Sequence, residues 1–233
     1  MTEKILSHQD FFKILILLQL PYKNYQMNRF DNEAKNWDKN TGALERATIF
    51  AREIKQYLKP NTSQNALEFG CGTGLLSFEL QDVFNTITLV DTSQGMIDVL
   101  KEKIEAQGLS HFTPVLADLL QEGTNITGVD VLYTLMTLHH INDLSQIFKV
   151  FYTLLAPNGY LCIADLVKED GTFHPAEMNF DGHYGFDKEK LSAELAAHGF
   201  ETVSYSIPYS IEKQHGTTVK KYPLFLLIAK KVP

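Results

Sequence analysis

The 233-residue chain contains only two cysteines, Cys71 and Cys162, which are too few for a disulfide framework. Such sparing use of cysteine fits a reducing compartment, and we expect the protein to be cytoplasmic. The chain also lacks a basic run that would neutralise nucleic-acid phosphates, and its net charge at pH 7 is −7. We therefore expect no general binding of nucleic acid.

No long hydrophobic run is present. The apolar stretch at residues 11–20 is far shorter than the roughly 20 residues that span a bilayer, so we expect no stable membrane insertion. No small-residue cleavage site follows it, and we interpret it as a short appended helix that ends at Pro21. A natural start at Met27 is the alternative.

Two kinds of catalytic motif are missing. The nucleophile pattern G-x-S-x-G does not occur, which argues against serine hydrolase chemistry. His139, His140, Asp165, His174 and His183 form the best available set of metal ligands, but no short spacing among them matches a known site. From the sequence we expect no metal.

The pattern of apolar residues predicts a single α/β domain with a small N-terminal addition. Strands are expected at 66–69, 87–90, 113–117, 130–136 and 160–164, with helices between them that begin at Ser93, Asp143 and Asp187. A turn is expected at 157–159. Alternating strands and helices imply a parallel sheet covered on both faces. Two final extended runs, at 202–210 and 224–230, are joined without a helix and predict an antiparallel hairpin.

The most informative segment is residues 66–74, which read ALEFGCGTG. A glycine-rich turn after a strand lets a ligand approach the backbone closely. Asp91 ends the next strand, where a carboxylate can accept hydrogen bonds from the hydroxyls of a ribose. Together these features predict a cofactor that contains a nucleoside. A strand-to-helix turn without a ligand, with Asp91 as a strand-end cap, is the alternative.

The spacing of the glycines separates two classes of cofactor. A dinucleotide fingerprint needs its third glycine where Leu75 stands. The observed G-x-G-x-G with Glu68 in front resembles instead the first motif of the class I (Rossmann-like) S-adenosylmethionine-dependent methyltransferases. In such a site the backbone N–H groups of the turn can meet the carboxylate of the cofactor, and Glu68 can face its ammonium group.

Three further segments resemble this family in the same order, namely ADL at 117–119, DVLYTLMTLHHI at 130–141 and LLAPNGYLCI at 154–163. The resemblance runs from about residue 30 to the C-terminus and is closest to the quinone-biosynthesis and small-molecule methyltransferases. It implies a doubly wound seven-stranded sheet of order 3-2-1-4-5-7-6 with strand 7 antiparallel. It also implies that 1–40 are an extension and cofactor-covering segment and that 41–233 are the methyltransferase domain.

The resemblance implies S-adenosylmethionine-binding roles for residues along these segments: Trp37, Glu68, Gly70, Cys71, Gly72, Asp91, Thr92, Met96, Asp118, Leu119 and Thr134. Within this set, Asp91 would bind the ribose, while the Asp118 side chain and the Leu119 N–H would meet the adenine edge. Other interpretations stay open at this point. Asp118 could cap a turn, Met96 and Trp37 could be core residues, and Cys71 could be a small turn residue.

Two places are candidates for work on the acceptor. His140, in the His139–His140 pair after the fourth strand, could act on substrate, or the pair could only orient its loop. His183 lies in a long polar and aromatic connection, 173–187, of the kind that often forms a functional lid. It could act as a base or orient the substrate, or its segment could simply shape the approach to the helix at Asp187.

These observations predict an enzyme that transfers a methyl group from S-adenosylmethionine to a small-molecule acceptor and releases S-adenosylhomocysteine. Two other classes stay open. One is a protein that binds a nucleoside cofactor without turnover, and the other is a nicotinamide-dependent oxidoreductase on a Rossmann-like fold.

Overall fold

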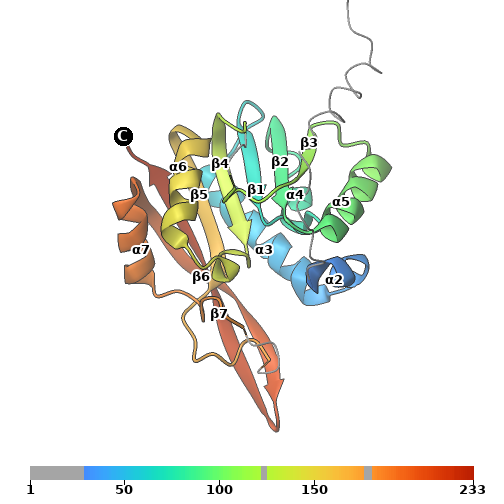
Figure 1. Cartoon of the computed structure of the whole chain (residues 1–233), viewed down its shortest axis with the longest axis vertical. Helices are drawn as coiled ribbons and strands as arrows, with labels where there is room; N and C mark the ends of the chain where they lie inside the picture. The colour runs from blue at the N-terminus through green and yellow to red at the C-terminus, as the bar shows by residue number, and fades with distance from the viewer. Residues whose placement is uncertain (1–28, 122–124, 176–179) are drawn as a thin grey trace, which may run out of the picture.

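A computed structural model describes residues 29–121, 125–175 and 180–233. Its centre is a 7-stranded sheet of order β3-β2-β1-β4-β5-β7-β6 (Figure 1). The strands are β1 (Asn65–Phe69), β2 (Thr86–Asp91), β3 (Phe112–Leu116), β4 (Val129–Leu135), β5 (Leu155–Leu166), β6 (Phe200–His215) and β7 (Thr218–Lys231). Strands β1 to β5 pair in parallel, and β7 is antiparallel to both β5 and β6. The predicted strand order and the antiparallel β7 are confirmed. The expected helix before Pro21 and the alternative start at Met27 lie outside the described residues.

Four of the described helices begin after a residue whose side chain caps them, namely Asn40, Ser93, Asp143 and Asp187. The described helices are α2 (Arg29–Trp37), α3 (Thr41–Leu58), α4 (Leu75–Glu79), α5 (Gln94–Gln107), α6 (Leu144–Leu154) and α7 (Lys188–Ala197), with a short 3₁₀ turn η1 (Leu138–His140). Side chains of Ser93, Asp143 and Asp187 each accept a hydrogen bond from a backbone N–H three residues later. These contacts satisfy donors that a helix start leaves without partners, and they confirm the three predicted caps.

Alternate residues of the sheet enter two separate cores. On one face, buried residues of α3, α4 and α5, such as Phe50, Leu76 and Ile97, pack against the sheet. On the other face, α6 and α7 bury Phe151 and Leu195 against it. Helices therefore cover both faces, as predicted, and the central strands have no solvent-facing side (Figure 1).

The structure corrects two predicted boundaries. The turn expected at 157–159 lies inside β5, as an irregularity where Val129 pairs with Leu155 but Val131 pairs with Tyr160. The final hairpin is longer than its two apolar runs and extends beyond the rest of the molecule (Figure 1). Its outer residues are mostly exposed, so their sequence has no apolar alternation to mark them as strands.

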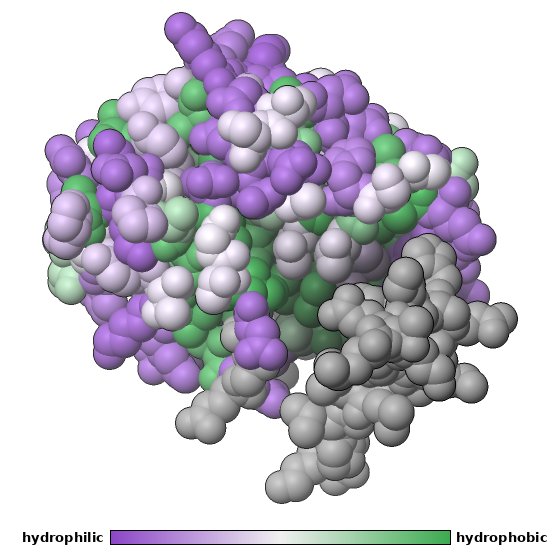
Figure 2. Space-filling view, turned by 90° about the horizontal axis from the view of Figure 1, so that it is seen from above, coloured by the Kyte–Doolittle hydropathy of each residue, from purple (hydrophilic) through white to green (hydrophobic). Residues whose placement is uncertain are grey.

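Hydrophilic residues cover much of the face seen from above, and hydrophobic residues gather near its centre (Figure 2). Some apolar side chains therefore reach the surface at this end of the molecule. No helix within the three described ranges is long and apolar enough to cross a membrane.

Phe151 tests the core beneath α6. Its side chain is fully buried, and its ring meets that of Phe69 edge-on at 5.1 Å. Truncation leaves a cavity, so Phe151→Ala should lower the free energy of unfolding by about 3–5 kcal/mol in urea titrations. Val219→Ala on the exposed hairpin should change it by less than about 0.5 kcal/mol. Equal losses in the two variants would contradict this description of the core.

Candidate functional site

A cavity of about 1060 Å³ lies at the carboxyl ends of β1, β2 and β4, with α2, α3 and β6 on its other sides. Open parallel sheets bind ligands at this edge, and the volume suits a small-molecule site. Most of the predicted site residues line it: Trp37, Glu68, Gly70, Cys71, Gly72, Asp91, Thr92, Met96 and His140. Asp118, Leu119, Thr134 and His183 are not among the lining residues. The fold therefore brings the glycine turn, the end of β2 and one candidate histidine to a single cavity.

The glycine turn forms the floor of this cavity. Gly70 and Gly72 both have positive φ, at 67° and 52°, a conformation that favours glycine. A Cβ on Gly70 would lie 2.2 Å from the Thr137 side chain, so Gly70 allows the turn to pack against the loop after β4. A Cβ on Gly72 would meet nothing closer than Met96 Sδ and Trp37 Nε1, both at 3.9 Å. The backbone at Gly72 is thus open to a ligand between those two side chains.

Asp91 joins the turn to β2. Its carboxylate accepts hydrogen bonds from the backbone N–H of Gly72 at 2.7 Å and of Ser93 at 2.8 Å. Burial raises the pKa of Asp91, while these backbone donors oppose the rise. A carboxylate has about four lone-pair positions, so these bonds leave acceptor capacity for hydroxyl groups in the cavity.

Glu68 lies beneath the turn and is only 3% exposed. Its carboxyl oxygen accepts hydrogen bonds from the backbone N–H and the hydroxyl of Ser77, and that hydroxyl also contacts the Tyr133 hydroxyl at 2.7 Å. Burial raises the pKa of Glu68 to about 8. The carboxyl is therefore mostly protonated at pH 7, and a cation bound in the cavity would favour its ionised form.

Two carboxylates hold α2 over the turn, Asp31 in its first turn and Asp38 directly after its last residue. Asp31 accepts hydrogen bonds from the Ser93 hydroxyl at 2.6 Å and the Gly95 N–H at 2.9 Å. Asp38 binds Lys103 Nζ at 2.7 Å and the hydroxyl of Thr73. The described part of the predicted covering segment therefore lies over the cavity. The domain boundary at residue 40 stays a prediction.

The predicted adenine contacts lie beside the cavity. Asp118 is exposed, and its carboxylate accepts a hydrogen bond from the Leu120 N–H at 2.9 Å. This is the turn cap that the sequence left open as the alternative. Leu119 and Thr134 are buried, and no hydrogen-bond partner of Thr134 Oγ1 is found among the described residues. Ala117, directly before Asp118, does line the cavity, and roles in cofactor binding for the other three stay predictions.

Three histidines also line the cavity. The η1 turn presents His139 and His140, and His174 enters from the loop after β5. Burial, reinforced by the neighbouring histidines, lowers the pKa of His140 to about 3 and that of His174 to about 4. Both imidazoles are therefore uncharged at neutral pH. His139 is buried, with Nδ1 2.7 Å from a carboxylate oxygen of Asp165.

His183 supports the loop that carries this histidine pair. Its backbone N–H donates to the His139 carbonyl at 2.8 Å, and its ring Nε2 lies 2.9 Å from the Ile141 carbonyl oxygen. This support of the loop after β4 was not predicted from the sequence. A role as base or orienting group for His183 stays a prediction.

One wall of the cavity was not predicted. It consists of residues of α3 and the middle of β6, among them Glu45, Arg46, Tyr209 and Lys213. The Glu45 carboxylate accepts a hydrogen bond from the Tyr209 hydroxyl at 2.9 Å, and Lys213 Nζ donates to the Phe173 carbonyl at 2.6 Å. Burial lowers the pKa of Arg46. The sequence carries no local signal for this wall, because the chain folds back to α3 only in the hairpin.

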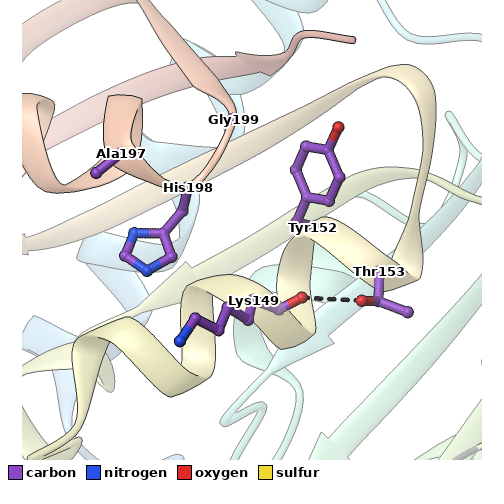
Figure 3. A pocket seen from close by; sticks show the side chains of 6 residues that line it. All are labelled: Lys149, Tyr152, Thr153, Ala197, His198 and Gly199. Carbon is purple, nitrogen blue, oxygen red and sulfur yellow. Dashed lines mark hydrogen bonds between the residues drawn. The ribbon is translucent and has the colours of Figure 1, made fainter.

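A second hollow of about 410 Å³ lies between α6 and the end of α7 (Figure 3). The Thr153 hydroxyl there donates to the Lys149 carbonyl at 3.0 Å. Both ring nitrogens of His198 are engaged, one by the Ser145 hydroxyl and the other by the Glu194 carbonyl. None of the predicted site residues lines this hollow, so the larger cavity is the candidate site.

Comparison with known proteins agrees with this placement. Residues 67–161 match the family model described as a methyltransferase domain. A Schizosaccharomyces pombe protein named as an uncharacterized methyltransferase is 33% identical over 144 residues, covering 56% of this chain and 51% of the relative. Phosphoethanolamine N-methyltransferase 1 of Arabidopsis thaliana is 28% identical over 193 residues, covering 82% of this chain and 38% of the relative. The chain thus spans about half or less of the length of these two proteins.

One solved structure shows the same fold over most of the chain. Phosphoethanolamine N-methyltransferase 2 of Haemonchus contortus, in complex with S-adenosyl-L-methionine, has a TM-score of 0.67 and 14% sequence identity. The superposition covers 92% of this chain and 62% of that chain. The likeness shows that the two chains share a Rossmann-like fold.

The buried carboxyl group of Glu68 predicts a specific pH dependence of stability. In the unfolded chain the Glu68 carboxyl has its ordinary pKa of 4.5, whereas in the folded chain its pKa is about 8. Between these two pH values the folded chain therefore binds one more proton than the unfolded chain. Stability should accordingly fall as the pH rises from 4.5 towards 8. Glu68→Gln removes this contribution, so the variant should lose less stability than the parent protein between about pH 5 and pH 8 in urea titrations.

The exposed Glu105→Gln is the matched control, because it makes the same substitution on the surface of α5. Its stability profile should follow that of the parent protein. If Glu68→Gln followed the same profile, Glu68 would ionise normally in the folded chain.

Proposed function

We propose that this chain, whose residues 67–161 are a methyltransferase domain of the class I S-adenosylmethionine-dependent family, methylates a small-molecule acceptor and releases S-adenosylhomocysteine. The observation that carries the proposal is the meeting of the glycine turn, Asp91 and Glu68 at one cavity. These groups offer a backbone open to a ligand, a ribose acceptor and a carboxyl group for a cationic amine within a single site.

The residues present fit the ribose and the ammonium group of the cofactor. Asp91 would accept hydrogen bonds from the ribose hydroxyls, and the open backbone at Gly72 would let the cofactor approach the turn closely. Glu68 would become ionised against the ammonium group. Trp37 and Met96 flank the open backbone at Gly72 and would pack against the bound cofactor.

The sulfonium of S-adenosylmethionine supplies an electrophilic methyl group when bound. The protein's contribution is to align the acceptor with it and to exclude water, and such positioning can supply roughly 7–11 kcal/mol in favourable cases. Helix α2, held by Asp31 and Asp38, would exclude water above the glycine turn. A base is needed only if the attacking atom must lose a proton. His140 lines the cavity, but burial lowers its pKa to about 3, so it would accept a proton only weakly at neutral pH.

We infer that the acceptor carries an anionic group. Arg46 is mostly buried in the cavity wall, and no ion pair or hydrogen bond of its guanidinium is found within the described ranges. A buried charge without a partner is unfavourable, so an acidic ligand beside it would be stabilised. The neighbouring carboxylate of Glu45 is engaged by the Tyr209 hydroxyl. The phosphate named in the phosphoethanolamine methyltransferases is an example of such a group in relatives.

We also propose a cytoplasmic location and no general nucleic-acid partner. Cys71 and Cys162 are both free and buried, which suits a reducing compartment. The net charge of −7 disfavours binding to polyanions.

Asp91→Ala tests the cofactor proposal by calorimetry with S-adenosylmethionine, S-adenosylhomocysteine and NADH. The parent protein should bind the first two, and the variant should bind them about 10- to 100-fold more weakly because hydrogen bonds to a charged group are lost. Asp98→Ala, on the exposed face of α5, should bind like the parent. Tight binding of NADH, or binding of S-adenosylmethionine that Asp91→Ala leaves intact, would refute the assignment. Binding without methyl transfer to any acceptor would favour the non-catalytic alternative.

Arg46→Gln tests the acceptor proposal. Methyl-labelled cofactor, incubated with the protein and metabolite extracts separated by charge, should label a product in the acidic fraction. Arg46→Gln should then raise KM for that acceptor about tenfold or more, while the affinity for S-adenosylmethionine is unchanged. Arg52→Gln, an exposed arginine of the same helix that pairs with Glu53, is the control. A labelled acceptor that is neutral or cationic would overturn the anionic assignment.

A further inference from the structure

Three histidines from two separate loops meet in the lining of the cavity. One ring nitrogen from each of His139, His140 and His174 lies within 4.8 Å of the others. Two of the three follow β4 and the third follows β5, so the parallel pairing of these strands brings them together. The cluster shares none of its residues with the glycine turn, although Thr137 of the same loop donates a hydrogen bond to the Gly70 carbonyl.

The first histidine is oriented by a buried carboxylate. Asp165 is fully buried and accepts hydrogen bonds from the backbone N–H of His139 at 3.1 Å and of Leu166 at 2.7 Å. Its Oδ1 lies 2.7 Å from Nδ1 of the His139 ring. A proton on Nδ1 leaves the lone pair on Nε2 available. Histidines that bind metals usually donate their second N–H to a carboxylate in this way, which sets both the tautomer and the ring orientation.

The third histidine is held in place but lacks a polar partner. The His174 ring stacks on Phe180 at 3.7 Å with an interplanar angle of 14°. Its Nδ1 is buried, and within the described residues no hydrogen-bond partner for this atom is found. A buried polar atom without a partner is unfavourable, and a metal ion would satisfy it.

The second histidine completes the set between aromatic rings. His140 meets Phe30 edge-on at 5.6 Å and Phe180 edge-on at 5.3 Å, with its ring centroid 4.2 Å from that of His139. These contacts hold the His140 ring beside that of His139.

We propose that His139, His140 and His174 bind one divalent transition-metal ion, with zinc as the best match. Three imidazoles and an open fourth position are the ligand set of catalytic zinc sites. Zinc–nitrogen bonds of about 2.0–2.1 Å would draw the three nitrogens closer by side-chain rotation. Imidazole also suits copper, nickel and iron, whereas the set lacks the oxygen ligands that magnesium and calcium prefer.

The fourth position of the ion would face the cavity that all three histidines line. This step rests on the proposed methyltransferase function. An acceptor hydroxyl or thiol bound there would release its proton to solvent more readily, because a bound cation stabilises the resulting anion. The anion would form a bond to the methyl carbon as the carbon–sulfur bond of the cofactor breaks, leaving a neutral thioether. Asp165 is in this arrangement a positioning residue, because it acts only through His139.

Metal content and affinity test the site directly, without reference to activity. The full chain, prepared without a histidine tag, is titrated with zinc against a chromophoric chelator, and its bound metal is measured by mass spectrometry. The parent protein should bind one equivalent. Asp165→Asn should weaken zinc binding 10- to 100-fold, as loss of such a supporting carboxylate usually does. His140→Ala and His174→Ala each remove a ligand and should weaken it further.

Two controls keep the test decisive. His111→Ala removes a histidine whose ring contacts the Gln81 carbonyl, far along the chain from the cluster, and it should retain full zinc affinity. Cobalt bound to the parent protein should give the visible absorption of a tetrahedral site, and His174→Ala should abolish it. If the parent bound zinc no better than His140→Ala or His174→Ala, the proposal would be wrong. Calorimetry with S-adenosylmethionine reports separately on the proposed function, so failure of either proposal can be recognised alone.

Discussion

The site depends on the carboxylate of Asp91, which links two strands that are neighbours in the sheet. By accepting hydrogen bonds from the Gly72 and Ser93 backbone N–H groups, it fixes the glycine turn after β1 to the start of α5. Helix α2 attaches to this same junction, because Asp31 binds Ser93 and Gly95. The turn, the cover and the end of β2 are thereby held as one unit. A ligand that engages Asp91 would meet a preorganised surface, which reduces the ordering that binding requires.

Buried polar groups are concentrated around this unit and carry a free-energy cost. Glu68 lies beneath the turn with a raised pKa, and Asp165 is fully buried below the histidine pair. Glu68 lines the cavity, whereas Asp165 does not and reaches it only through His139. Groups that are unfavourable in the empty protein but favourable with a charged partner point to function rather than stability. Arg46, in the cavity wall formed by α3 and β6, is a buried cation with a lowered pKa, and an anionic ligand would stabilise it in the same way.

The sequence predicted the cofactor-binding residues of the cavity better than its other lining residues. The residues of the glycine turn and Asp91 lie within one strand–turn–helix unit or at the end of the next strand. Their spacing in the sequence is therefore enough to predict that they lie side by side. Spacing alone is not enough for Asp118, because its carboxylate caps a turn and does not line the cavity. Among the other lining residues, His174 and Arg46 come from segments far apart in the chain. Sequence spacing therefore could not predict that they line the same cavity. His183, the preferred candidate from sequence, supports the loop from behind.

The sequence by itself determined the layered fold, the strand order implied by its resemblance to a known family, and the place of the nucleoside-binding turn. Glycine spacing, capping residues and apolar periodicity are local properties, and each acts within about one element of secondary structure. Only the tertiary structure decided which histidines meet, that the Arg46 guanidinium has no hydrogen bond or ion pair among the described residues, and how far the terminal hairpin extends. Those outcomes depend on strand pairing across the sheet and on burial, which bring together residues that are distant in the chain.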